Sequence, residues 1–203
     1  MSTLPADLWT AIVALWPPWS WEALAVVLAV AYLVLAIRES AWCWPAGIAS
    51  CVIYGALFFQ ARLYAESVLQ VFYVGVSVYG WRQWWRPARP LPVVTWSAAN
   101  HARALGVIAV LAGANGALLA AFTPAALPWL DAFVSWASVI TTWMVARKVL
   151  ENWIYWFVID SVSVFIYASR GLWLTAALFA GYLVLIVIGY RAWHRRLRQE
   201  PAR

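Results

Sequence analysis

The sequence predicts an all-α integral membrane protein with seven transmembrane helices, arranged as two parallel three-helix repeats joined by a linker helix. The first observation is composition. Of 203 residues, 66% are hydrophobic and only 11% are charged, whereas a soluble domain is about half apolar and about a quarter charged. The second is a series of seven apolar segments, each near the roughly 20 residues that a helix needs to cross a bilayer. The third is an internal match: the chain aligns with itself, without a gap, at a displacement of 109 residues, Trp44 falling on Trp153.

The internal match includes residue types that seldom coincide by chance in an apolar chain. The matching pairs are Trp44–Trp153, Leu63–Leu172, Leu69–Leu178, Tyr73–Tyr182, Gly80–Gly189 and Trp84–Trp193, with Ala23–Ala132, Val30–Val139 and Arg38–Arg147 upstream. A displacement of four helices returns each span to the same direction, so the two units are predicted to be parallel. Units that can move against each other are typical of transporters, although duplication can also simply build a stable bundle.

The elements follow in order from the apolar pattern. The first 20 residues are expected to be an interfacial segment, because they lack the basic leader and small-residue cleavage site of a secretory signal. Spans are predicted at about 21–37, 44–60, 64–85, 103–122, 129–146, 152–169 and 172–193. Each is expected to be a helix, because a backbone in hydrocarbon must satisfy its own hydrogen bonds. The predicted divisions are an N-terminal segment (1–20), a first repeat (21–86), a loop with the linker helix (87–128), a second repeat (129–194) and a basic cytoplasmic tail (195–203).

The basic residues set the predicted orientation. With the N-terminus outside, 12 of the 14 Lys and Arg residues fall on the cytoplasmic side, and only Arg62 and Arg170 fall outside. The net charge of +6 therefore indicates membrane topology, and nucleic acid is not an expected partner.

No cofactor or metal is expected, and the chain is not expected to be an enzyme. Cys43 and Cys51 lie eight residues apart on one predicted helix, too far for a disulfide, and His101 and His194 lie at helix ends. A retinal protein needs a lysine in the seventh span, where none occurs. An intramembrane enzyme needs a paired base or a catalytic motif, and the spans contain neither.

The residues themselves resemble the PnuC family of vitamin transporters, and the 3+1+3 layout is similar to that of SWEET sugar transporters. The resemblance is carried by residues 42–48, 57–66, 69–70 and 79–81 in the first half and by residues 151–156, 160, 171–176 and 189–190 in the second. It covers nearly all of the chain beyond residue 20. It implies transport of nicotinamide riboside for NAD biosynthesis, with relatives that carry thiamine or riboflavin. It further implies facilitated diffusion with phosphorylation trapping, a bacterial inner-membrane location and often a homotrimer. A proton-coupled carrier remains the mechanistic alternative.

The predicted sixth span carries the main candidate site. Asn152, Trp156 and Asp160 recur every four residues, so they share one helical face, which Tyr167 continues. Their counterparts in the first repeat are mostly small and nearly non-polar: Cys43, Gly47, Cys51 and Phe58. The predicted cavity is therefore polar on one wall and bare on the other.

These side chains suit a pyridinium riboside. The Trp156 ring face attracts a cationic ring, and Asn152 or Gln70 offers the donor and acceptor that a carboxamide needs. Asp160, the one carboxylate in the middle of a predicted span, can accept from ribose hydroxyls, or it can serve as structural glue between helices. The resemblance also places Gln70, Asn152 and Trp156 in the family's pocket.

Aromatic residues complete the candidate set. Tyr73 and Tyr182 are predicted either to contact ligand or to share a packing role. Trp44 and Trp153 are candidate contacts that fit an interfacial belt or an inner gate equally well. The tryptophans expected in the aromatic belt are Trp16, Trp19, Trp21, Trp81, Trp84, Trp85, Trp173 and Trp193. The fifth span carries Ser138, Thr141 and Thr142, which are expected to form hydrogen bonds between helices.

Overall fold

The computed structural model describes residues 18–60, 64–85, 91–124, 126–169 and 171–199. Within these ranges the chain is a bundle of seven helices, which confirms the predicted all-α fold class. The helices are α2 (Pro18–Ile37), α3 (Cys43–Gln60), α4 (Tyr64–Trp84), α5 (Ala98–Phe122), α6 (Pro128–Ala146), α7 (Asn152–Ser169) and α8 (Trp173–Gln199). Most of the predicted interfacial segment lies outside the described residues, as do Trp16, Arg62, Arg86, Arg89, Arg170 and Arg203.

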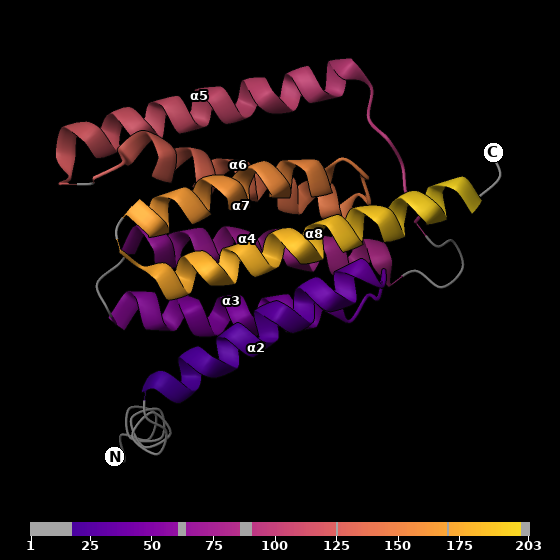
Figure 1. Cartoon of the computed structure of the whole chain (residues 1–203), viewed down its shortest axis with the longest axis horizontal. Helices are drawn as coiled ribbons and strands as arrows, with labels where there is room; N and C mark the ends of the chain where they lie inside the picture. The colour runs from indigo at the N-terminus through magenta and orange to yellow at the C-terminus, as the bar shows by residue number, and fades with distance from the viewer. Residues whose placement is uncertain (1–17, 61–63, 86–90, 125, 170, 200–203) are drawn as a thin grey trace, which may run out of the picture.

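The chain reverses direction from each helix to the next, so the helices lie roughly antiparallel along the long axis of the bundle (Figure 1). In the first triplet (α2, α3 and α4), α3 packs against both other helices, and in the second triplet (α6, α7 and α8), α7 does the same. Contacts of α4 with α6 and of α2 with α8 join the triplets. The linker helix α5 packs on α6 and forms the outermost layer, at the top of Figure 1.

Five helices, α2, α3, α5, α6 and α8, are long and apolar enough to cross a membrane, judged by length and composition over the described part of the chain. The other two, α4 and α7, are more polar. They carry most of the predicted site residues, namely Gln70 and Tyr73 on α4 and Asn152, Trp153, Trp156 and Asp160 on α7. Asn152 and Asp160 thus lower the hydropathy of α7, whereas in α4 Glu66, Arg82 and Gln83 contribute together with Gln70.

The helices meet at a basic end, which is the end of the bundle with Arg38, Arg82, Arg147, Lys148 and Arg196 (right side of Figure 1). Large apolar side chains point outward along the helices, among them Val71, Val110 and Phe165. Buried positions, in contrast, include serine, threonine, asparagine and aspartate. Apolar outside and partly polar inside is the arrangement that lipid surroundings favour.

The linker helix begins earlier than the apolar pattern predicts. α5 starts at Ala98, before the predicted start at Arg103, because Ser97 caps it: the Ser97 hydroxyl accepts from the backbone N–H of Asn100 at 3.4 Å. A serine at this position satisfies one of the N–H groups that a helix start leaves without an intrahelical partner.

The segment before α5 is tied to the turn between α6 and α7. The Val94 N–H donates to the Lys148 carbonyl at 3.0 Å, and the Leu150 N–H donates to the Val94 carbonyl at 2.8 Å. The Trp96 N–H donates to the Glu151 carboxylate at 3.2 Å. The turn that carries Lys148 is therefore held in place from the side of the linker.

Two sequence-based expectations are wrong. Trp84 and Trp193 are not belt residues: Trp193 is fully buried, and each indole N–H donates to a backbone carbonyl inside the bundle. Thr141 and Thr142 do not bond between helices, since their hydroxyls donate to carbonyls one turn back in α6 at 2.7 and 2.8 Å. A hydroxyl in a helix has this local acceptor within reach, so it needs no partner on another helix.

Candidate functional site

Asn152 is the first residue of α7 and is completely buried. Its side-chain nitrogen donates to the Val149 carbonyl at 2.6 Å. Its side-chain oxygen is also buried, and it has no hydrogen-bond partner in the described part of the chain. Buried polar atoms are nearly always bonded, so this oxygen is available to a ligand or to water.

Asp160 lies two turns further along α7, about 12 Å from Asn152 at the helical rise of 1.5 Å per residue. The residue is buried, and no hydrogen bond or ion pair holds its carboxylate within the described ranges. Tyr182 of α8 is near enough for the two groups to interact electrostatically, and Tyr54 of α3 is in turn near Tyr182. These three residues bring side chains of both triplets together in the middle of the bundle.

Tyr73 of α4 interacts with the Ser138 hydroxyl of α6, so this predicted site residue joins the two triplets by a polar contact. Cys51 of α3 and Tyr32 of α2 lie near Tyr73. The Tyr32 hydroxyl is buried and has no hydrogen-bond partner among the described residues. The wall provided by the first triplet is thus less bare than predicted.

Trp156 and Gln70 lie between these positions and are both half-buried. The Trp156 ring packs against both apolar clusters of the bundle, one around Trp153 at the basic end and one around Ile159. Gln70 packs over Gly55 of α3, with its Cβ 3.5 Å from the point where a side chain on Gly55 would begin. Each of these two side chains thus keeps part of its surface free of contact with the described protein.

Trp44 and Trp153 lie in the apolar cluster at the basic end, against which Trp156 also packs. Trp44 packs on Gly80 and Trp153 packs on Gly189, in each case so closely that a Cβ on the glycine would overlap the indole. Both tryptophans are buried, and their indole N–H groups have no partner within the described ranges. Together with Asn152, these two are the predicted contacts most enclosed by protein.

Sequence reasoning missed Tyr54 and Tyr32 as members of the candidate site. Tyr54 lies one turn beyond Cys51 and two turns beyond Gly47, so it continues the face that was predicted to be bare. The helical spacing was the signal for Tyr54. No comparable signal in the sequence identifies Tyr32, because its position in α2 corresponds to Thr141 in α6 rather than to another tyrosine.

The two buried charged side chains of the described interior differ in whether they are paired with an opposite charge. Among the described residues, the buried charged side chains are Asp160 and Lys148, and Lys148 is already paired with Glu39 at the basic end. The other buried charged side chain in this part of the chain, Asp160, is therefore an acid without a paired cation. No group of three or more His, Cys, Asp or Glu side chains within the described ranges is placed to hold a metal ion.

The fold and its buried polar interior define a multi-pass membrane transporter, and comparison with known proteins identifies the family. The sequence model of the nicotinamide mononucleotide transporter family matches residues 19–195, so the chain belongs to that family.

Among curated relatives, the nicotinamide riboside transporter PnuC of Escherichia coli is 27% identical over 91% of this chain and 89% of that protein. The riboflavin/roseoflavin transporter RibM of Streptomyces davaonensis is 29% identical over 86% of this chain and 84% of that protein. A crystal structure of the vitamin B3 transporter PnuC shares the fold, with a TM-score of 0.70, 18% identity and coverage of 95% of this chain and 88% of that one.

Proposed function

We propose that this protein carries nicotinamide riboside across the bacterial inner membrane by facilitated diffusion, with phosphorylation inside the cell trapping the substrate. The observation that carries the proposal is the buried, unpartnered oxygen of Asn152 in a chain of this transporter family. The nicotinamide carboxamide has an N–H₂ group that can donate to this oxygen. The name of the Escherichia coli relative supports the same substrate.

The charge of the interior supports the riboside rather than the mononucleotide. Nicotinamide riboside carries one positive charge on its ring, which the Asp160 carboxylate and the face of Trp156 both attract. The mononucleotide adds a phosphate, which proteins usually bind with arginine, lysine or a helix N-terminus. Within the described residues, the buried cation is Lys148, and Glu39 already neutralises it.

The remaining candidates have complementary roles in this proposal. Asn152 and Gln70 bind the carboxamide, Trp156 stacks on the pyridinium ring, and Asp160 accepts from ribose hydroxyls. Tyr73 and Tyr182 line the path from the two triplets: Tyr73 contacts the Ser138 hydroxyl of α6, and Tyr182 lies within electrostatic reach of Asp160 of α7.

Riboflavin is the second candidate substrate, because RibM is 29% identical to this chain. Riboflavin is a larger, uncharged ring system, so it gains nothing from the charge of Asp160. Thiamine, like the riboside, contains a cationic ring but lacks the carboxamide.

Calorimetric titration of the purified protein tests the proposal. We expect nicotinamide riboside to bind, and the mononucleotide, thiamine and riboflavin to bind at least about tenfold more weakly, a difference of about 1.4 kcal/mol. Tighter binding of riboflavin or of the mononucleotide would assign the chain to the corresponding transport activity instead.

Uptake measurements test the mechanism separately. In cells that lack the riboside kinase, facilitated diffusion predicts that unmodified riboside equilibrates across the membrane but does not accumulate. Accumulation that disappears when the proton gradient is collapsed would favour the proton-coupled alternative.

The proposal includes the duplicated architecture: a first repeat (21–86), a linker region (87–128) and a second repeat (129–194), with the N-terminus outside. Matching contacts at a displacement of 109 residues support it, since Trp44 packs on Gly80 as Trp153 packs on Gly189. The described basic side chains gather at one end of the bundle, which supports the orientation.

A homotrimer, which the resemblance implies, is tested by light scattering in detergent.

A further inference from the structure

A row of four tryptophans crosses the bundle at its basic end. Trp44 meets Trp84 edge-on, with ring centroids 5.3 Å apart and an interplanar angle of 86°. Trp153 meets Trp193 in the same way, at 5.3 Å and 90°. Trp84 and Trp193 then face each other across the junction of the two triplets, 6.0 Å apart. The four rings therefore form a continuous row of contacts that spans the junction between the two triplets.

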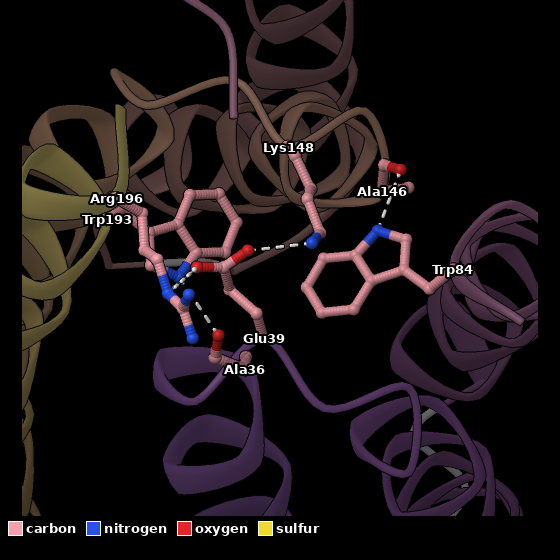
Figure 2. A network of polar contacts seen from close by, with 7 residues as sticks. All are labelled: Ala36, Glu39, Trp84, Ala146, Lys148, Trp193 and Arg196. Carbon is pink, nitrogen blue, oxygen red and sulfur yellow. Dashed lines mark hydrogen bonds and ion pairs between the residues drawn. The ribbon is translucent and has the colours of Figure 1, made fainter. Parts of the chain in front are cut away.

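Two hydrogen bonds cross the same junction in opposite directions (Figure 2). The Trp84 indole of the first triplet donates to the Ala146 carbonyl at the end of α6, and the Trp193 indole of the second triplet donates to the Ala36 carbonyl near the end of α2. Both distances are 3.1 Å. Each triplet thus binds the backbone of the other through a matching side chain.

A buried lysine forms an ion pair across the same junction. The ammonium of Lys148, in the turn after α6, lies 2.8 Å from the carboxylate of Glu39, in the turn after α2. The two residues are 109 positions apart, and both have a left-handed backbone, with φ of 52° and 55°. The Lys148 ammonium also lies over the Trp84 ring, 4.8 Å from its centroid (Figure 2).

The contacts within each triplet differ in kind from those across the junction. Within a triplet, an indole fits against a glycine so closely that no side chain could be inserted, as at Trp44 and Gly80. Such packing resists displacement, because a close-packed interior has discrete rather than continuous arrangements. Across the junction at the basic end, the polar contacts among the described residues include the two indole hydrogen bonds, a hydrogen bond from Arg147 to the Tyr79 hydroxyl at 3.5 Å, and ion pairs of Glu39 with Lys148 and Arg196. The Glu39 side chain keeps 17% of its surface exposed.

We propose that Glu39, Lys148, Trp84 and Trp193 form the cytoplasmic gate of the transporter and that the structure shows this gate closed. Opening separates Glu39 from Lys148 and breaks both indole hydrogen bonds, while each triplet moves as a unit. Lys148 is buried, whereas the Glu39 side chain keeps 17% of its surface exposed, so water can reach the pair from the Glu39 side and hydrate both ions as they part. The gate rests on the proposed transport function, although not on the identity of the substrate.

Cys43 offers a direct probe of the gate. Its thiol is fully buried in the cluster that contains Trp193, and it lies within electrostatic reach of Lys148. In a Cys51→Ala background Cys43 is the remaining cysteine of the chain. A hydrophilic maleimide added to inside-out vesicles should therefore label the protein slowly while the gate is closed.

We expect Glu39→Gln and Lys148→Gln each to increase the labelling rate of Cys43 by about fivefold or more, because loss of the ion pair shifts the population toward the open state. The charge-swapped double variant, Glu39→Lys with Lys148→Glu, should restore slow labelling. The matched control is Arg196→Gln, because Arg196 lies 3.6 Å from Glu39 but is 65% exposed, and such pairs contribute little. Parental labelling rates in both single variants, or fast labelling in the double swap, would overturn the gate.

A reversible cross-link gives a second test that does not depend on the folding of charge variants. In a chain without native cysteines, Glu39→Cys and Lys148→Cys are joined by a short reducible bis-thiosulfonate. We expect uptake of nicotinamide riboside to stop on cross-linking and to return on reduction. Undiminished uptake by the cross-linked protein contradicts the gate. No uptake before cross-linking contradicts the proposed substrate, and the labelling experiment then still decides whether the gate exists.

Discussion

At the scale of single residues, Asn152 shows how a buried side chain can be prepared for a ligand. Its nitrogen is fixed by the Val149 carbonyl, so the amide cannot turn freely, and its oxygen has no partner in the described structure. A buried acceptor without a partner costs free energy, and a ligand that donates to it recovers that cost. Binding and the local stability of the α7 start are therefore linked.

Replacement of Asn152 or Trp156 by alanine should weaken binding of nicotinamide riboside. We expect each change to cost about 1 kcal/mol or more, or about fivefold in Kd, through loss of an amide contact or of a stacked ring. Calorimetry on the purified variants measures this. Asn100→Ala is the matched control, since its side chain only accepts from Arg103 at the exposed start of α5. Unchanged affinity in both variants, with normal gel-filtration profiles, would move the pocket elsewhere.

Asp160→Asn tests whether charge selects the substrate. The carboxylate attracts the cationic ring of nicotinamide riboside but not the uncharged ring of its reduced form, so the variant should bind the oxidised form more weakly with little change for the reduced form. The measured quantity is the ratio of the two dissociation constants. An identical ratio in the variant and the parent would show that Asp160 is structural glue.

At the scale of helices, close packing of tryptophan on glycine organises both triplets. Gly80→Ala and Gly189→Ala should each lower the stability of the protein, because the new Cβ overlaps an indole ring. Overpacking of this kind costs about 1–3 kcal/mol. Thermal unfolding in detergent, followed by loss of the monodisperse peak, measures the effect.

The controls for this prediction come from the same helices. Gly75 of α4 and Gly181 of α8 have nothing within 4 Å of an added Cβ. Alanine there should be neutral or stabilising by about 0.5–1 kcal/mol, because it favours the helical backbone. Trp44→Phe should partly rescue Gly80→Ala by shortening the ring. Equal losses at all four glycines would mean that the indole contacts do not determine helix packing.

The helices themselves could be predicted well from sequence, because a backbone that crosses a bilayer must satisfy its own hydrogen bonds and therefore forms helices. The span at 152–169 coincides with α7, and the others differ mainly at their ends. α5 starts early because of the Ser97 cap, and α8 continues to Gln199 through residues that were predicted to form a tail. The length of an apolar segment reflects the thickness of the hydrocarbon layer that the segment crosses. A helix can extend beyond that layer for as long as its backbone N–H and C=O groups keep their hydrogen bonds.

The candidate site could be predicted only in part. Spacing placed Asn152, Trp156 and Asp160 on one helix, and α7 has the predicted extent. Spacing could not distinguish a tryptophan at the membrane interface from one that crosses the bundle, so Trp84 and Trp193 were assigned to the wrong environment. Contacts between triplets depend on tertiary packing, which a helical period does not describe.

At the scale of the whole molecule, the basic end predicts the orientation in the membrane. A fluorescent protein fused after Gln199 should fluoresce, because it remains in the cytoplasm, and alkaline phosphatase fused there should be inactive. The same reporters fused after Gln60, at the other end of α3, should behave in the opposite way. Active phosphatase at Gln199 together with a fluorescent reporter at Gln60 would reverse the proposed topology.

The opposite charges of Glu39 and Lys148 bear on how such a chain could arise. The two residues are at corresponding positions, they share an unusual backbone conformation, and they carry opposite charges. An assembly of two identical three-helix subunits would place the same side chain twice at this point, and like charges would repel. In the proposed duplicated architecture, by contrast, both copies are joined in one polypeptide, so selection can change one without changing the other. Attraction at the symmetry axis is thus a property that a fused gene can acquire and a homodimer cannot.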